Sequence, residues 1–219
     1  MPETVDFIRP AELRAALRRL AVVQLLFHKR QPDSWFRLES DGITAVAGWN
    51  DFVGNTCHFL FSPAGNVLLG FDHESPMSPH AGEKPDVFEA WPGVYDSLPE
   101  PLMKAVEANP FGEFDPQEVT LCLWNKTATK TWQKGDIEYP DCDHGSPDGQ
   151  GYLLSWFREY VENFGGKLSD QYGWEIDDDA AAELLAGDKI TRNCLTTLKP
   201  GCRVTDLIPH LEAMGYRID

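Results

Sequence analysis

The sequence predicts an α+β fold with an N-terminal helix, an antiparallel sheet of about five or six strands and a helical C-terminal region. Apolar residues recur at helical spacing between residues 10 and 29. Residues 35–71 then hold short runs of β-branched and aromatic residues, and helical spacing returns after residue 150. We expect residues 1–165 to form one α+β domain and residues 166–219 to form a small helical appendage packed on it.

The predicted N-terminal helix begins at Pro10, because proline is tolerated in a first turn, and ends near residues 29–32. One stripe of this helix carries Leu13, Leu17, Leu20 and Gln24, and another carries Arg14 and Arg18. A basic amphipathic helix can lie on a membrane surface, but a helix that packs on a sheet and exposes its other face needs no partner. We prefer packing on the sheet.

Four runs predict an antiparallel meander. They are residues 35–39, 43–49, 56–61 and 67–71, separated by Asp41-Gly42, residues 50–55 and residues 62–66. Residues 67–71 are apolar throughout, so this strand should be central and covered on both faces. Residues 118–124 predict a further strand, with which residues 131–137 would pair.

The segment between residues 75 and 99 contains five prolines, which disfavour regular structure. A loop of this length is usually either functional or disordered, and its aromatic residues argue against disorder. Phe88, Trp91 and Tyr95 are therefore the predicted binding residues. Stacking on a sugar is one role for such rings, and packing in the core is the simpler one. The pattern Ser97-x-x-Glu100 is a capping box and predicts a helix.

The C-terminal region is predicted to be helical. Apolar residues follow helical spacing over residues 153–164, and Gly165-Gly166 predicts where this helix ends. Shorter helices are expected at residues 178–186, 190–198 and 206–214.

The cysteines indicate a reducing compartment. Their number, five, is odd and none lies in a Cys-x-x-Cys pair, which argues against a disulfide framework and against a zinc finger. The first residues lack the regions of a signal peptide, and the longest apolar run, residues 20–27, is too short to cross a bilayer. We therefore expect a cytoplasmic protein that is not bound to a membrane.

The chain is strongly acidic. It holds thirty-five Asp and Glu against nineteen Lys and Arg, a net charge of −16. Residues 1–37 hold seven basic and four acidic side chains, so this part carries +3 and the rest −19. Such a body repels phosphate backbones and anionic lipids, which argues against nucleic acid as a partner. A basic protein or a metal ion would be compatible, although the simpler interpretation is that the charge provides solubility.

The first candidate site is Gly70-Phe71-Asp72-His73-Glu74, where an apolar run ends in three ionisable residues. If the strand continues to Glu74, Asp72 and Glu74 lie on one face and His73 on the other. Two adjacent carboxylates suit a hard cation or an acid and base pair. The alternative, which we prefer, is that both carboxylates cap a turn or pair with Lys or Arg, while His73 forms a hydrogen bond.

The second candidate segment is residues 141–149. It begins like a calcium loop, but Ser146 and Tyr152 occupy the positions that require glycine and glutamate, so an EF-hand is excluded. We prefer a turn leading into a helix, with Asp148 or Ser146 near its N-cap. Asp143 and His144 would join Asp72 and Glu74 in a metal site only if the fold brings the segments together.

Several common motifs are absent from the sequence. It contains no nucleophile elbow, no phosphate-binding glycine loop, no His-Glu-x-x-His and no dinucleotide-binding fingerprint. We therefore predict no cofactor.

Four segments resemble those of uncharacterised bacterial proteins. They are Gly70-Phe71-Asp72-His73-Glu74-Ser75, Trp91-Pro92-Gly93-Val94, Leu121-Cys122-Leu123-Trp124 and Asp148-Gly149-Gln150-Gly151-Tyr152-Leu153-Leu154. The last segment is also similar to the end of the SMI1/KNR4 superfamily, which includes immunity proteins that bind toxins. The resemblance of the four segments to bacterial proteins implies a bacterial source but no mechanism. The superfamily's N-terminal Leu-Pro helix pattern is missing, so no functional residue is carried over.

These observations favour a non-enzymatic cytoplasmic binding protein, immunity-like or regulatory, with an acidic recognition surface. Its expected partner is a basic protein. The alternative is a metal-dependent hydrolase that uses Asp72 and Glu74, with His73 or His144 as ligand or general base.

Overall fold

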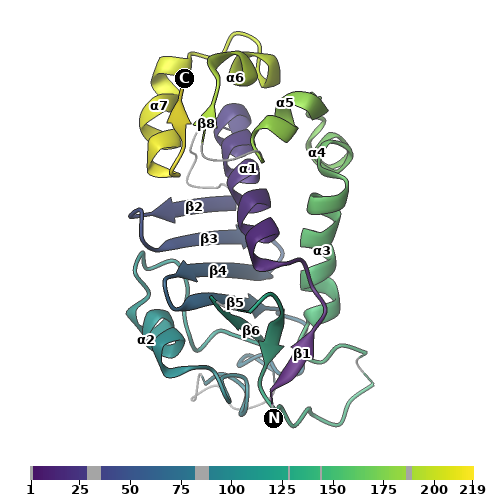
Figure 1. The fold of residues 1–219 in the computed structure, drawn as a ribbon. Coiled ribbons are helices and arrows are strands. Elements are labelled where there is room, and N and C mark those ends of the chain that lie inside the picture. The colour runs from purple at the N-terminus through teal and green to yellow at the C-terminus, as the bar shows by residue number, and fades with distance from the viewer. Residues whose placement is uncertain (1, 29–35, 82–88, 128, 144, 186–188) are drawn as a thin grey trace.

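The computed structural model describes residues 2–28, 36–81, 89–127, 129–143, 145–185 and 189–219. A seven-stranded antiparallel sheet forms the centre, and helices cover both of its faces (Figure 1). The predicted α+β class, N-terminal helix and helical C-terminal region are confirmed. The predicted number of five or six strands is wrong.

The strands follow the order β1-β7-β6-β5-β4-β3-β2 across the sheet. Their bounds are Glu3–Val5 (β1), Phe36–Ser40 (β2), Ala45–Asn50 (β3), Thr56–Ser62 (β4), Gly65–Phe71 (β5), Leu121–Lys126 (β6) and Trp132–Lys134 (β7). The strand missing from the prediction is β1, whose three residues are too few to show an alternating pattern. It is stabilised by antiparallel pairing with β7, in the register Glu3 opposite Lys134.

β5 is the central strand, as its apolar composition predicts. It pairs with β4 on one side and with β6 on the other. Leu68 belongs to the core on one face of the sheet, whereas Val67 and Leu69 belong to the core on the other face. Consecutive apolar residues are therefore needed here, because side chains alternate between two covered faces.

The larger core lies under helices α1 (Pro10–His28) and α3 (Gln150–Glu162). Aromatic side chains fill it, and the ring of Phe157 on α3 packs edge-on against Phe59 at 4.6 Å between ring centroids. The apolar stripe of α1 faces this core, as predicted, with Leu13, Leu17 and Leu20 almost fully buried.

The C-terminal helices extend the same core. They are α4 (Phe164–Tyr172), α5 (Asp178–Glu183), α6 (Arg192–Leu198) and α7 (Val204–Ala213), joined by a parallel pair of short strands, β8 (Lys189–Ile190) and β9 (Arg217–Ile218). Gly165 and Gly166 do not end the helical region, because α3 already ends at Glu162 and the two glycines lie in the first turn of α4.

Helix α2 (Glu100–Ala108) covers the other face of the sheet. Leu102 and Val106 of α2 pack on a smaller core with Phe114 from the following loop. The capping-box prediction is wrong, since Ser97 has a φ of +65° in a turn and the helix begins after Pro99 without a side-chain cap. None of the helices within the described residues is long and apolar enough to span a membrane.

Candidate functional site

Asp72 closes a turn at the end of β5. Its Oδ1 accepts a hydrogen bond from the backbone N–H of Glu74 at 3.0 Å, and its carbonyl accepts one from the N–H of Ser75 at 3.1 Å. This turn ends the strand at Phe71, so Asp72 and Glu74 do not share one strand face. Asp72 is buried while the Glu74 side chain is 77% exposed. The arrangement fits the capping role preferred above.

His73 is held by two neighbours. Its Nδ1 lies 3.0 Å from Oδ1 of Asn55, and its Nε2 lies 3.0 Å from Oε1 of Glu74. Asn55 in turn donates to Asp51 at 2.6 Å. The imidazole therefore joins the end of β5 to the loop between β3 and β4.

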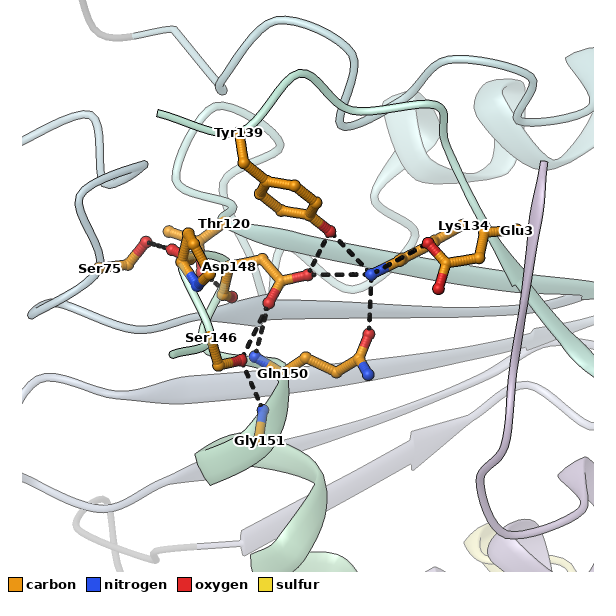
Figure 2. Close-up of polar contacts among 10 residues, drawn as sticks. Glu3, Ser75, Thr120, Lys134, Tyr139, Ser146, Asp148, Gln150 and Gly151 are labelled. Carbon is orange, nitrogen blue, oxygen red and sulfur yellow. Dashed lines mark hydrogen bonds and ion pairs between the residues drawn. The ribbon is translucent and has the colours of Figure 1, made fainter. Parts of the chain in front are cut away.

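The fold brings the two candidate segments of the sequence together. The hydroxyl of Thr120 accepts a hydrogen bond from the backbone N–H of Asp72 at 3.2 Å and donates to the carbonyl of Asp148 at 3.0 Å. Ser75 donates to the carbonyl of Pro147 (Figure 2). Gly149 packs so closely on Asp72 that a Cβ there would lie 2.5 Å from the Cβ of Asp72.

Two of the predicted metal ligands, Asp143 and His144, are not shown to take part in the contact between the two segments. Asp143 is exposed, and His144 lies outside the described residues. In the part of the chain that the structure describes, no three His, Cys, Asp or Glu side chains are grouped so that they could hold a metal ion. The metal-dependent hydrolase therefore stays a prediction, and the described residues offer no set of metal ligands for it.

An ionic cluster beside this contact joins β7 to the start of α3 (Figure 2). The ammonium group of Lys134 donates to the hydroxyl of Tyr139 at 2.7 Å and to Oε1 of Gln150 at 3.3 Å. It also lies 3.5 Å from Oδ2 of Asp148 and 3.5 Å from Oε2 of Glu3. The hydroxyl of Tyr139 donates to Oδ2 of Asp148 at 3.0 Å.

The cluster favours a charged lysine and a neutral tyrosine. Burial lowers the pKa of Lys134, but the hydrogen bond to Tyr139 and the nearby carboxylates of Asp148 and Glu3 raise it more. Burial raises the pKa of Tyr139, and Asp148 adds to this effect, while Lys134 opposes it. Neither group is activated as a base or nucleophile at neutral pH, so the cluster acts as a clamp.

The predicted turn before α3 is confirmed. Oδ1 of Asp148 accepts from the N–H of Gln150 at 3.0 Å, and the hydroxyl of Ser146 accepts from the N–H of Gly151 at 2.9 Å (Figure 2). These side chains satisfy N–H groups in the first turn of the helix, which have no partner within it.

The predicted binding aromatics Trp91 and Tyr95 hold their loop on the α2 face. Nε1 of Trp91 donates to the carbonyl of Glu138 at 3.0 Å, and the hydroxyl of Tyr95 donates to the carbonyl of Pro116 at 2.6 Å. Both rings are partly buried against the smaller core. Phe88 lies outside the described residues.

A pocket of about 310 Å³ opens on the α2 face of the sheet. Three of its residues lie in one row across neighbouring strands, with Gly48 opposite Arg37 on β2 and opposite His58 on β4. Gly48 has no side chain to fill the row. Glu113 and Phe114, from the loop after α2, cover the gap.

One nitrogen of the His58 imidazole has no partner among the residues that the structure describes. Its Nδ1 is inaccessible to solvent and makes no hydrogen bond with any of them. Burial, with a smaller contribution from Arg37, lowers the pKa of His58 to about 4, so the ring is neutral at pH 7. Nε of Arg37 lies 3.7 Å from Oε2 of Glu113.

Sequence reasoning missed Arg37, His58 and Glu113. The available signal was a histidine in the middle of an otherwise apolar strand, opposite a glycine in the middle of the neighbouring strand. Only the register of β3 on β4 shows that the two positions are adjacent.

No protein-family model matches this chain, and neither a curated protein nor a solved structure matches it at a significant level. The resemblance to the SMI1/KNR4 superfamily stays a prediction.

Proposed function

We propose that the chain is a non-enzymatic binding protein that recognises a basic partner protein through residues 89–120, the acidic segment. This segment holds seven acidic residues and one basic residue, a net charge of −6. The seven are Glu89, Asp96, Glu100, Glu107, Glu113, Asp115 and Glu118, and none of them is buried. This density of carboxylates on one face of the sheet is the observation that carries the proposal.

The scaffold supports recognition by a preorganised surface. The acidic segment is anchored by Leu102, Val106 and Phe114, which are buried in the smaller core. The one lysine of the segment, Lys104, already pairs with Glu100 at 2.6 Å. Within the described residues, Glu107 and Asp115 form no ion pair, so their charges are available to a partner.

Three buried thiols and one buried lysine are not activated as nucleophiles. Burial raises the pKa of Cys57, Cys122 and Cys194, which keeps these thiols protonated. Lys134 is held as a cation. These properties favour binding over covalent catalysis.

The test is binding of a fluorescent peptide of alternating arginine and alanine, followed by anisotropy. We expect binding at about 20 mM salt that weakens strongly at about 300 mM, because screening shortens the reach of exposed charges. Replacement of the two acidic residues, Glu107→Lys and Asp115→Lys, should weaken binding at low salt.

Glu212→Lys is the matched control, because Glu212 is an exposed carboxylate on α7, outside the acidic segment. It should leave most of the binding intact. Equal losses in the control and in the acidic-segment variants, or binding that does not respond to salt, would contradict the proposal.

A further inference from the structure

We infer that the pocket formed by Arg37, Gly48, His58, Glu113 and Phe114, the Gly48 pocket, receives the guanidinium group of an arginine side chain from the basic partner. The inference rests on the proposed function and names the group that the acidic segment selects.

The absence of a side chain at Gly48 creates the space. A Cβ on residue 48 would lie 3.3 Å from Nδ1 of His58 and 3.8 Å from Oε2 of Glu113. Nδ1 of His58 and Oε2 of Glu113 therefore both lie next to the backbone of Gly48. A side chain at residue 48 would occupy the space between these groups, whereas glycine takes up none of it.

The carboxylate of Glu113 can accept hydrogen bonds from a ligand. His58 is neutral, so its ring adds no positive charge to the pocket, and its solvent-inaccessible Nδ1 has no hydrogen-bond partner among the described residues. Among the described residues, no group donates a hydrogen bond to the carboxylate of Glu113, and its 3.7 Å contact with Arg37 is longer than a hydrogen bond. A ligand with several N–H donors can satisfy this carboxylate.

The charge of the lining favours a cation. Glu113, Asp115 and Glu118 are among the residues that line the pocket, against the single cation of Arg37, although the Glu118 carboxylate also pairs with His80 at 2.8 Å. Arg37 is the group most easily displaced, because its side chain is 57% exposed and its ion pair with Glu113 is long. An anionic ligand would meet more acidic than basic residues in this lining.

Size and shape favour guanidinium over a larger ligand. A volume of about 310 Å³ lies at the small end of ligand sites, so it suits one side chain rather than a cofactor. The rings of Phe71 and Phe114 also line the pocket. A flat guanidinium group stacks on aromatic rings and gives carboxylates two parallel hydrogen bonds, whereas an ammonium group does neither.

The first test compares two peptides at near-physiological salt, one of alternating arginine and alanine and one of alternating lysine and alanine. Glu113→Gln should weaken binding of the arginine peptide about tenfold, the cost of one charged hydrogen bond. It should affect the lysine peptide much less. Glu107→Gln is the control, because it removes an equal charge from the acidic segment outside the pocket.

The second test uses Nα-acetyl-arginine amide, a single guanidinium without other charges, and NMR of the ring nitrogens of His58. We expect saturable shifts of the His58 signals that Gly48→Val abolishes. A circular dichroism spectrum and a urea titration establish that each variant is folded. If Gly48→Val does not fold, Glu113→Gln supplies the same comparison.

The two proposals fail in different ways. If the arginine peptide binds with salt dependence but Glu113→Gln behaves like Glu107→Gln and His58 does not shift, the pocket is wrong and the acidic surface stands. If neither peptide binds at low salt, the proposed function is wrong, and a shift of His58 with acetyl-arginine amide alone would assign the pocket to a small free guanidinium compound.

Discussion

Lys134 and Asp148 form an ion pair inside the protein, with 3.5 Å between Nζ and Oδ2 and side chains that are 8% and 4% exposed. The pair joins β7 to the turn before α3, and Tyr139 and Gln150 supply the remaining hydrogen bonds. Such a pair adds little stability over a well-packed apolar pair, but loss of one partner leaves a buried charge without a counterion.

The first prediction concerns this pair. Lys134→Met should lower the free energy of unfolding by about 3–5 kcal/mol, because Asp148 is left buried without its counterion. The double variant Lys134→Met/Asp148→Leu should recover a large part of the loss. Glu3→Gln is the control and should cost under about 1 kcal/mol, since the Glu3 side chain is 63% exposed. Urea titrations measure the free energy of unfolding of each variant. If the loss in the double variant equals the sum of the losses in the two single variants, Lys134 and Asp148 are not coupled.

The pH dependence of the same pair gives a further check. The pKa of Lys134 is raised in the folded state, so its contribution is fully present below the unfolded pKa and is lost as the pH rises through the folded value. Urea titrations above about pH 10 should therefore show a loss of stability that the Lys134→Met variant lacks.

The second prediction concerns His58 at acidic pH. Its pKa is about 4 when folded, against 6.5 for an unperturbed histidine, so the unfolded chain takes up the proton first as the pH falls. This group should remove about 2–4 kcal/mol of the free energy of unfolding between about pH 6.5 and pH 4. His58→Gln should flatten this part of the profile in urea titrations, and an unchanged profile in this variant would contradict the prediction.

The third prediction concerns Gln24 on α1. Its side chain is 5% exposed, and neither its amide nitrogen nor its amide oxygen has a hydrogen-bond partner in the described part of the chain. Gln24→Met should raise the free energy of unfolding by about 1–2 kcal/mol, because the variant no longer buries unsatisfied polar atoms. Gln150→Met is the opposite case and should lower stability, because Gln150 accepts a hydrogen bond from Lys134. Equal effects of the two changes would show that Gln24 has a partner.

The fourth prediction concerns the thiols. Cys142 is exposed, Cys202 is partly buried, and the remaining three are buried with raised pKa values. A thiol reagent such as Ellman's should therefore modify Cys142 rapidly in the native protein, and Cys57, Cys122 and Cys194 only after unfolding. Cys142→Ser should abolish the fast phase. A fast phase that survives in this variant would place a second reactive thiol at the surface.

Strong local patterns predicted most of the elements. The four runs of the meander lie within a few residues of β2 to β5, and the apolar run of β5 predicted its central place. β1 was missed because three residues carry no periodic pattern, so its strand character comes from pairing with β7. The capping-box prediction at Ser97 was wrong for a related reason. The backbone turn at Ser97, rather than the spacing of Ser97 and Glu100, decides where α2 begins.

The candidate site was only partly predictable. Asp72 was correctly marked as a special position at a strand end, but the reason is a local turn and the close packing of Gly149. The Gly48 pocket depends on the register of the strands and on a loop that folds back over the sheet. A short stretch of sequence predicts neither of these. Long-range pairing therefore determines the part of the site that local patterns do not reveal.

The edge position of β1 has a consequence for biosynthesis. Neighbouring strands in the meander can pair as soon as each hairpin leaves the ribosome, since short loops close quickly. β1 leaves first, yet its partner β7 is made only after residue 134 is added. The first strand to be synthesised is therefore the last strand of the sheet able to pair. Until β1 pairs with it, one edge of β7 remains open, and truncation of the first five residues would leave that edge exposed to other nascent chains.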